Sequence, residues 1–417
     1  MTDTGAADAR PDAPLRRIAD LPMLTRRDDP AMDDHAYLAQ ALETDSLWRD
    51  RTGFLYTLTY DQFRTVLDES LTRQIETEGL RLRGITSGPA WEFFSNSLLT
   101  SNGAAHTRRR TPLARTFAFP MMRALRPEVA AAARDLIAPM AGRDAVDVLN
   151  EVAGPFPAAV IARVLGVPAD DIPTFTTLVY SAIRVLGGRS DAVMAEADAD
   201  MGRLIDYVSA LMADRRAEGR DDFLTRFLAA VDDGALSEEE IRISLVTLIL
   251  AGSDTTRAAM TVTLAHLLDN PDQWALLRDD PETWKGPAVE EGLRYEPAVG
   301  AFARIAVTEF ALARTRIVPG TVIIPLLLPA LRDPDIYADP DRFDFTRTDH
   351  PRHSPAFGGG AHRCLGEALA RVELEECMAA FATHWPKARI LDGLPRMRGL
   401  MGTRGIDQLR VAPGDAA

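Results

Sequence analysis

The sequence predicts a mainly α-helical protein with small β-sheets, an α+β fold class. Hydrophobic residues recur at helical spacing through most of the chain from Glu128 onward. Segments with strand character are short, and the strongest lie at 54–60, 304–310 and 316–324. The last of them contains the turn pair Pro319-Gly320, which is typical of a hairpin.

The chain offers no obvious point at which to divide it. Residues 1–15 are polar and rich in Ala, Asp and Pro, and no low-complexity linker or internal repeat follows them. A length of 417 residues would allow two or three domains. We nevertheless expect a loose leader over 1–15 and a single domain over 16–417.

The composition is that of a globular protein without a nucleic-acid or membrane partner. Hydrophobic residues make up 46% of the chain, and the net charge of −14 disfavours binding to nucleic acid. The first 20 residues contain no apolar segment of the kind found in secretory signals. The longest apolar runs, 243–251 and 321–331, are shorter than the roughly 20 residues of a membrane span. We expect a soluble, cytoplasmic protein.

The clearest predicted helix runs from Ser237 to about Asn270. Ser237 and Glu240 form a capping box ahead of an apolar face. The middle of this helix has the sequence Ala-Gly-Ser-Asp-Thr-Thr, residues 251–256, and its glycine and threonines disfavour helix. A costly defect in a long core helix indicates a functional site. The alternative is an irregular core helix whose Asp–Thr pair satisfies only itself.

A second helical stretch, 288–295, carries Glu291 and Arg294. Side chains three residues apart share one helix face and can form an ion pair. On its own this pair is a weak signal, because such pairs are common on solvated helices.

The most informative segment surrounds Cys364 and has the sequence Phe-Gly-Gly-Gly-Ala-His-Arg-Cys-Leu-Gly, residues 357–366. The glycines allow a tight turn and leave room for a flat ligand. Residues 366–371 have helical character, so Cys364 is expected at a helix N-terminus, which favours a thiolate. A thiolate on such a surface suits the iron of a porphyrin. The alternative is a buried cysteine at a glycine-rich turn. The other cysteine, Cys377, lies at helical core spacing, and two cysteines cannot hold an iron–sulfur cluster of four Cys ligands.

These motifs, taken in order, resemble those of the cytochrome P450 family, and the resemblance extends from about Leu38 to Val411. It implies a single-domain cytochrome P450 fold in which haem b lies between the long helix and the cysteine loop. The residues that it places against the haem are His106, Arg110, Ala251, Arg304, Phe357, Gly358, His362, Cys364 and Gly366, with Cys364 as the iron ligand.

The resemblance also implies roles around the haem. Asp254 would relay protons and Thr255 would hydrogen-bond the oxygen that is being activated. Glu291, Arg294 and Arg342 would form a buried network that positions the cysteine loop.

By the same resemblance, the substrate pocket would be lined from several segments. Its lining would include Thr247, Leu250, Gly300 and Phe302, with the strand entry at 299–302 and residues near 400–403. Segment 76–99 would form a roof, and 171–185 a mobile lid. The expected substrate is a small apolar or aromatic molecule.

The activity implied is that of a monooxygenase, which inserts one atom of O2 into the substrate. Between His106 and Pro127 the chain has six arginines and no acidic residue, so this stretch is expected to steer an acidic redox partner. A separate ferredoxin or flavodoxin with an NAD(P)H reductase would supply the electrons. The alternatives are a haem-thiolate enzyme with peroxide-driven or oxidative-coupling chemistry, and a haem-binding protein without catalysis.

Overall fold

Most of the described chain is helical. The structure, a computed structural model, describes residues 14–25, 32–117, 119–187, 191–231 and 234–414. The expected leader lies almost wholly outside the described residues. In the first half of the chain the helices are α1 (Asp34–Leu42), α2 (Tyr60–Val66), α3 (Glu78–Leu82), α4 (Pro89–Asn96), α5 (Gly103–Thr116), α6 (Phe119–Ala124), α7 (Arg126–Ile137), α8 (Pro155–Val164), α9 (Ile172–Ala182) and α10 (Asp191–Ala217). They continue with α11 (Phe223–Val231), α12 (Glu238–Asp269), α13 (Pro271–Asp279), α14 (Pro281–Tyr295), α15 (Leu327–Ala330) and α16 (Glu367–His384).

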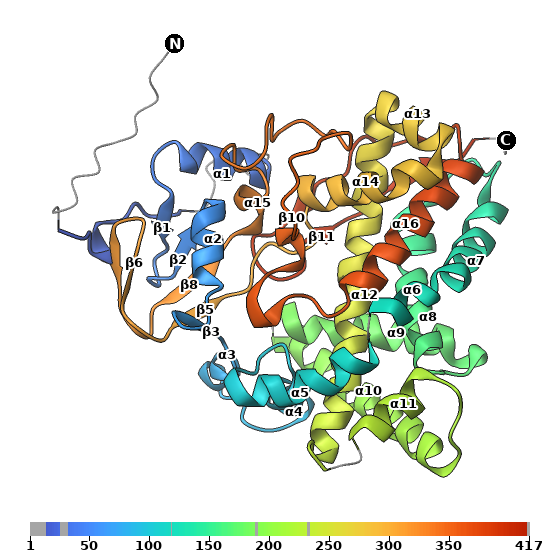
Figure 1. The fold of residues 1–417 in the computed structure, drawn as a ribbon, viewed down its shortest axis with the longest axis horizontal. Coiled ribbons are helices and arrows are strands. Elements are labelled where there is room, and N and C mark those ends of the chain that lie inside the picture. The colour runs from blue at the N-terminus through green and yellow to red at the C-terminus, as the bar shows by residue number, and fades with distance from the viewer. Residues whose placement is uncertain (1–13, 26–31, 118, 188–190, 232–233, 415–417) are drawn as a thin grey trace.

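The strands are short, and those of the largest sheet lie with β6 on one side of the molecule, away from most of the helices (Figure 1). Their bounds are β1 (Leu47–Arg49), β2 (Leu55–Thr57), β3 (Thr72–Gln74), β4 (Val146–Asp147), β5 (Arg304–Ala306), β6 (Phe310–Leu312), β7 (Thr315–Ile317), β8 (Val322–Pro325), β9 (Arg389–Ile390), β10 (Met397–Arg398), β11 (Gly405–Ile406) and β12 (Arg410–Ala412). The largest sheet has the order β1-β2-β8-β5-β3, in which only β2 and β8 run parallel. Smaller sheets are formed by β6-β7, by β10-β11 and by β4-β12-β9. The predicted class, mainly helical with small sheets, is confirmed.

Helix α12 crosses the helical part of the molecule from end to end (Figure 1). Its predicted start is confirmed in detail: the Ser237 hydroxyl accepts a bond from the Glu240 N–H, and the Glu240 carboxylate accepts one from the Ser237 N–H. Side chains on all sides of α12, such as those of Ile243 and Ile249, are fully buried in the main core. A helix that is surrounded in this way can support a site near its middle.

The predicted motif helix, α14, crosses α12 at close range. A Cβ atom at Gly292 would lie 2.3 Å from Thr263 Oγ1, so only glycine permits this approach. The close contact fixes the height of α14 along α12. Among the described residues, no helix combines the length and the apolar composition that a membrane crossing requires.

A buried ionic cluster joins the N-terminal helix to the end of α14. The Glu296 carboxylate lies 3.0 Å from His35 Nε2 and 3.9 Å from His266 Nε2, and it also pairs with Arg404. Arg404 lies in turn 3.4 Å from the buried carboxylate of Asp34. The cluster therefore ties α1, α12 and α14 to the β10–β11 hairpin.

Acidification is expected to destabilise this cluster. Burial, aided by the nearby Arg332 and His35, lowers the pKa of His266 to about 4, and Glu296 only partly opposes this shift. The unfolded chain titrates near 6.5, so between these values it binds a proton that the folded protein does not. Stability therefore falls as the pH falls. From pH 7 to 5 the loss through His266 is expected to be about 2 kcal/mol.

Urea unfolding at both pH values checks this expectation. His266→Gln should lose less stability on acidification than the parent, whereas replacing the exposed His353 by Gln should leave the loss unchanged. A parent-like loss in His266→Gln would contradict the assignment.

Candidate active site

The cysteine loop is closed by backbone hydrogen bonds. Two 3₁₀ turns, Pro355–Phe357 and Gly360–His362, precede Cys364, whose N–H donates to the Phe357 carbonyl over 2.8 Å. Gly358 has φ +71°, a conformation that favours glycine, and no atom lies within 4 Å of the position that a Cβ would take there. The loop therefore leaves open space beside Gly358, as the sequence predicted.

Solvent reaches Cys364, although protein atoms surround most of its thiol. Burial raises the pKa of its thiol, while the Gly366 N–H, Arg110 and Arg363 act in the opposite direction. Cys364 lies just before α16, which begins at Glu367, so the cysteine stands at a helix N-terminus as predicted. That this position favours a thiolate stays a prediction. A metal ion at the sulfur would supply the positive charge that the thiolate requires.

Arg371 on α16 connects the cysteine loop to α14. Its guanidinium carbon lies 4.9 Å from the centre of the Phe357 ring. It also pairs with Glu290 on α14 and, over 3.2 Å, with Glu367. From the sequence, Arg371 was assigned only to a helix, although its i,i+4 spacing from Glu367 already indicated an ion pair.

The two predicted histidines meet beside the loop. The rings of His106, on α5, and His362 have centroids 3.9 Å apart, although the residues are far apart in sequence. Both Nε2 atoms are buried and have no hydrogen-bond partner among the described residues. Burial lowers the pKa of His106 to about 4 and that of His362 to about 3, with further lowering from nearby positive charge. Buried, unpaired nitrogen atoms of this kind indicate a missing polar partner.

Two arginines complete this cluster. Arg110 lies one turn after His106 and donates to the Arg363 carbonyl over 2.5 Å. Arg304 on β5 is buried and is held by Thr72, with Nε 2.6 Å from the hydroxyl. The positive charge of both arginines adds to the lowering of the pKa of His362. The donor set fits the two carboxylates of a haem, and accessible Cys364 fits its iron.

The predicted defect in α12 is present, and its hydroxyl groups bond back to the helix. Thr255 Oγ1 donates to the Ala251 carbonyl over 2.9 Å. Ala251 is exposed, whereas Ile249 and Leu250 just before it are fully buried. Open space therefore adjoins α12 at Ala251, where the resemblance placed the oxygen site. The neighbouring Asp254 carboxylate forms an ion pair with Arg257, which sequence analysis had not singled out.

The predicted Glu–Arg pair is one of the most deeply buried in the protein. Arg294 binds both oxygens of Glu291, at 2.7 and 2.8 Å, and neither side chain is exposed. Arg294 also donates to the carbonyls of Pro340 and Arg342, and the Asp344 N–H donates to Glu291. The pair thereby anchors the loop that leads to the cysteine segment.

The third member of this network is Arg347, and the prediction of Arg342 is wrong. The Arg342 side chain is 68% exposed and reaches only Asp344, at 3.7 Å. Arg347 is buried, and its Nε lies 3.1 Å from Glu291 Oε2. Arg342 contributes its backbone carbonyl, because its side chain leaves the loop on the solvent side.

The predicted pocket residues are not all accessible. Leu250 is fully buried in the core, and the Thr247 hydroxyl is bonded to Ile243 and lies 3.0 Å from Ser97 Oγ. Gly300 is clamped by backbone bonds to Gly402 and Leu327, and a Cβ there would lie 2.5 Å from the Leu400 backbone. Of these four residues only Phe302 presents its side chain, at 59% exposure.

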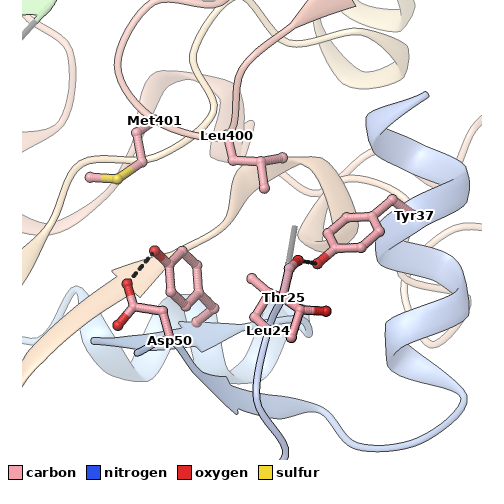
Figure 2. Close-up of a pocket in the computed structure, with 7 residues that line it drawn as sticks. Leu24, Thr25, Tyr37, Asp50, Leu400 and Met401 are labelled. Carbon is pink, nitrogen blue, oxygen red and sulfur yellow. Dashed lines mark hydrogen bonds between the residues drawn. The ribbon is translucent and has the colours of Figure 1, made fainter. Parts of the chain in front are cut away.

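A cavity of about 490 Å³ lies at the predicted segment 400–403. Figure 2 shows Leu400 and Met401 facing Leu24, Tyr37 and Asp50 across it. Its polar groups are largely satisfied within the wall, since Tyr37 donates to the Thr25 carbonyl and Tyr56 donates to Asp50. The remaining surface comes from Leu24, Leu400, Met401 and the tyrosine rings.

The arginine-rich segment is less basic than its sequence suggests. Glu240 pairs with both Arg108 and Arg109, while Glu375 and Glu376 pair with Arg126. These carboxylates come from α12 and α16, so the segment alone could not reveal them. Of the six arginines, Arg108, Arg115 and Arg123 are exposed, and Arg108 among them pairs with Glu240.

Replacing Arg347 by Leu is expected to destabilise the protein by about 3 kcal/mol, because it removes a partner of the buried Glu291 charge. Arg342→Leu, the matched control, should cost less than about 0.5 kcal/mol, since its side chain is exposed. Urea unfolding of both variants measures the difference. Equal losses would contradict the revised network.

Comparisons with known proteins agree with this site. The family model described as cytochrome P450 matches residues 89–283 and 287–384. The plant-inducible cytochrome P450-pinF1 of Rhizobium radiobacter is 38% identical over 91% of this chain and 90% of its own length. Luteothin monooxygenase of Streptomyces thioluteus is 32% identical over 95% and 97%, respectively. The crystal structure of CalO2 superposes with a TM-score of 0.84 at 31% identity, covering 91% of this chain and 96% of that one.

The matched family model spans α12, the buried Glu291–Arg294 pair and the cysteine loop together. Relatives at this level of identity cover nearly all of both chains. The chain is therefore an oxygenase that belongs to the cytochrome P450 family of haem-thiolate enzymes.

Proposed function

We propose that this chain is a monooxygenase that holds haem b through Cys364 and inserts one atom of O2 into a small apolar or aromatic molecule. The observation that carries this proposal is the cluster of unpaired His106 and His362 nitrogens beside the accessible cysteine. Among the described residues neither nitrogen has a hydrogen-bond partner, since the Glu69 carboxylate stays 3.6 Å from His362 Nε2, and haem carboxylates would satisfy both. We further propose that residues 16–417 form one domain and that the protein is cytoplasmic.

Bound haem would supply the activation of O2, and the protein would hold and orient it. Cys364 would ligate the iron from one face. His106, Arg110, Arg304 and His362 would bind the two carboxylates at the edge. The space left beside Gly358 would admit the flat ring.

Asp254 and Thr255 on α12 would hold and move protons beside the bound haem. Reduction of O2 to one inserted atom and one water consumes two protons, so the site needs a donor close to the reacting oxygen. Thr255 now donates to Ala251, and rotation of its hydroxyl would direct the proton toward the open space at that residue. Asp254 adjoins it on α12 and would exchange protons with solvent. This pair favours O2-dependent chemistry over the alternative of a purely peroxide-driven enzyme.

The electrons would come from a separate ferredoxin or flavodoxin and its NAD(P)H reductase. The exposed positions Arg115 and Arg123 support an acidic partner on the α5–α6 side, although internal ion pairs reduce the basic surface.

The apolar or aromatic substrate is proposed from the resemblance, and the cavity in Figure 2 agrees with it only in its mostly apolar surface at the predicted segment 400–403, since neither the cysteine loop nor α12 lines that cavity. Its lining of Leu24, Tyr37, Tyr56, Leu400 and Met401 offers mostly apolar surface, and the tyrosine hydroxyls are already bonded. The relative from Streptomyces thioluteus is named as a monooxygenase of luteothin.

Thr255→Ala is expected to keep the haem and to divert electrons from product to peroxide, because it removes the proton-donating hydroxyl. The measurement is product and peroxide formed per NAD(P)H consumed. Thr261→Ala is the matched control, since Thr261 makes the same bond one turn back on α12, to Arg257. Unchanged coupling in Thr255→Ala would contradict the assignment.

Apolar ligands are expected to shift the ferric iron of the holoenzyme toward high spin, because they would displace water from the site. A visible absorption titration would compare monoterpenes, aromatic acids, fatty acids, steroids and macrolides with polar sugars. A response to sugars, with none to the apolar compounds, would overturn the substrate class.

A further inference from the structure

The Asp254 carboxylate is held by an arginine that is itself held by another helix. Arg257 lies three residues later on α12 and forms an ion pair with Asp254 Oδ1. The Arg257 guanidinium carbon lies 4.5 Å from the centre of the Tyr180 ring on α9. The Tyr180 hydroxyl donates to the Gly154 carbonyl over 2.7 Å, at the start of α8. A continuous chain of contacts therefore leads from Asp254 to α9.

Each link in this chain is sheltered from water. The Asp254 side chain is 15% exposed and that of Arg257 is 31% exposed. Tyr180 is half-buried, and burial raises the pKa of its phenol, so the hydroxyl stays neutral and remains a donor to Gly154. A cation over an aromatic ring gains strength as both are desolvated, so the ring fixes the guanidinium as well as covering it.

The arrangement leaves one carboxylate oxygen in a defined direction. Arg257 engages Oδ1, and among the described residues no hydrogen bond engages Oδ2. Arg257 Nε is buried and has no partner there either. A charge-assisted bond to one oxygen fixes the rotation of the carboxylate. The orientation of Oδ2 relative to Thr255 thus depends on where Tyr180 places Arg257.

We propose that Arg257 and Tyr180 are positioning residues for Asp254, and that they couple the position of α9 to proton delivery at the haem. This inference rests on the proposed function of Asp254. Tyr180 lies on α9, which falls within the segment 171–185 that the resemblance implied as a lid. Its contact with Arg257 therefore links the place of α9 to that of the Asp254 carboxylate.

Four variants of the holoenzyme separate the contributions. Arg257→Gln removes the charge, and Arg257→Lys keeps it. Tyr180→Leu removes the ring, and Tyr180→Phe keeps the ring but loses the bond to Gly154. The probe substrate is the compound of the titration panel that gives the largest spin-state shift.

Arg257→Gln and Tyr180→Leu are expected to slow turnover about ten-fold and to raise its solvent deuterium isotope effect, because a misplaced proton donor makes proton transfer limiting. Arg257→Lys and Tyr180→Phe should stay within about two-fold of the parent. Arg17→Gln, which breaks the exposed i,i+3 ion pair with Asp20, is the control and should leave turnover unchanged.

Urea unfolding tests the contact between Arg257 and Tyr180 without relying on turnover. If the ring and the guanidinium act as one unit, the urea midpoint of the double variant Arg257→Gln/Tyr180→Leu will match that of the more affected single variant. Simple additivity of the two shifts would overturn the link between α9 and Arg257. Haem content, measured in every variant, excludes loss of cofactor as the cause of slow turnover.

Asp254→Asn, assayed in parallel, separates this inference from the proposed function. If Asp254→Asn is slow while Arg257→Gln and Tyr180→Leu behave as the parent, the positioning role is overturned and the proton role of Asp254 stands. If Asp254→Asn also behaves as the parent, both assignments fall. Slow turnover in all three supports the inference.

Discussion

The fully buried carboxylate of Glu291 imposes the constraint on which the cysteine site depends. An ionised group without solvent must be matched by buried donors, or the fold would lose several kcal/mol. Arg294, Arg347 and the Asp344 N–H supply that match, and two of the three come from the loop after Pro340. Burial of one charge on α14 therefore determines where the segment leading to Cys364 can lie.

The same helix acts at several other points. Glu290 pairs with Arg371, whose guanidinium covers the Phe357 ring in the cysteine loop. At its end, Glu296 holds the N-terminal helix and the β10–β11 hairpin through buried ion pairs. The contact between Gly292 and Thr263 sets α14 against α12. One element thus connects the cysteine loop, α12 and the β10–β11 hairpin, which contributes a wall of the cavity.

Local signals predicted much of this arrangement. The bounds of α12 followed from a capping box and a proline after Asn270, and the glycine-rich loop followed from backbone freedom that other residues lack. Contacts between segments that are distant in the sequence were harder to predict. The sequence could not show whether Arg342 or Arg347 pairs with Glu291, because both are arginines of one loop and only the fold decides which side chain turns inward. Tyr180 has no sequence signal at all, because its partner on α12 is reached only through packing.

Ligation of iron by Cys364 is the central claim, and the absorption spectrum of the reduced protein under carbon monoxide tests it most directly. The parent is predicted to show the long-wavelength Soret band of a thiolate-ligated haem. Cys364→His should keep haem but lose that band. A parent that binds no haem, or a spectrum that is the same in both proteins, would contradict the account.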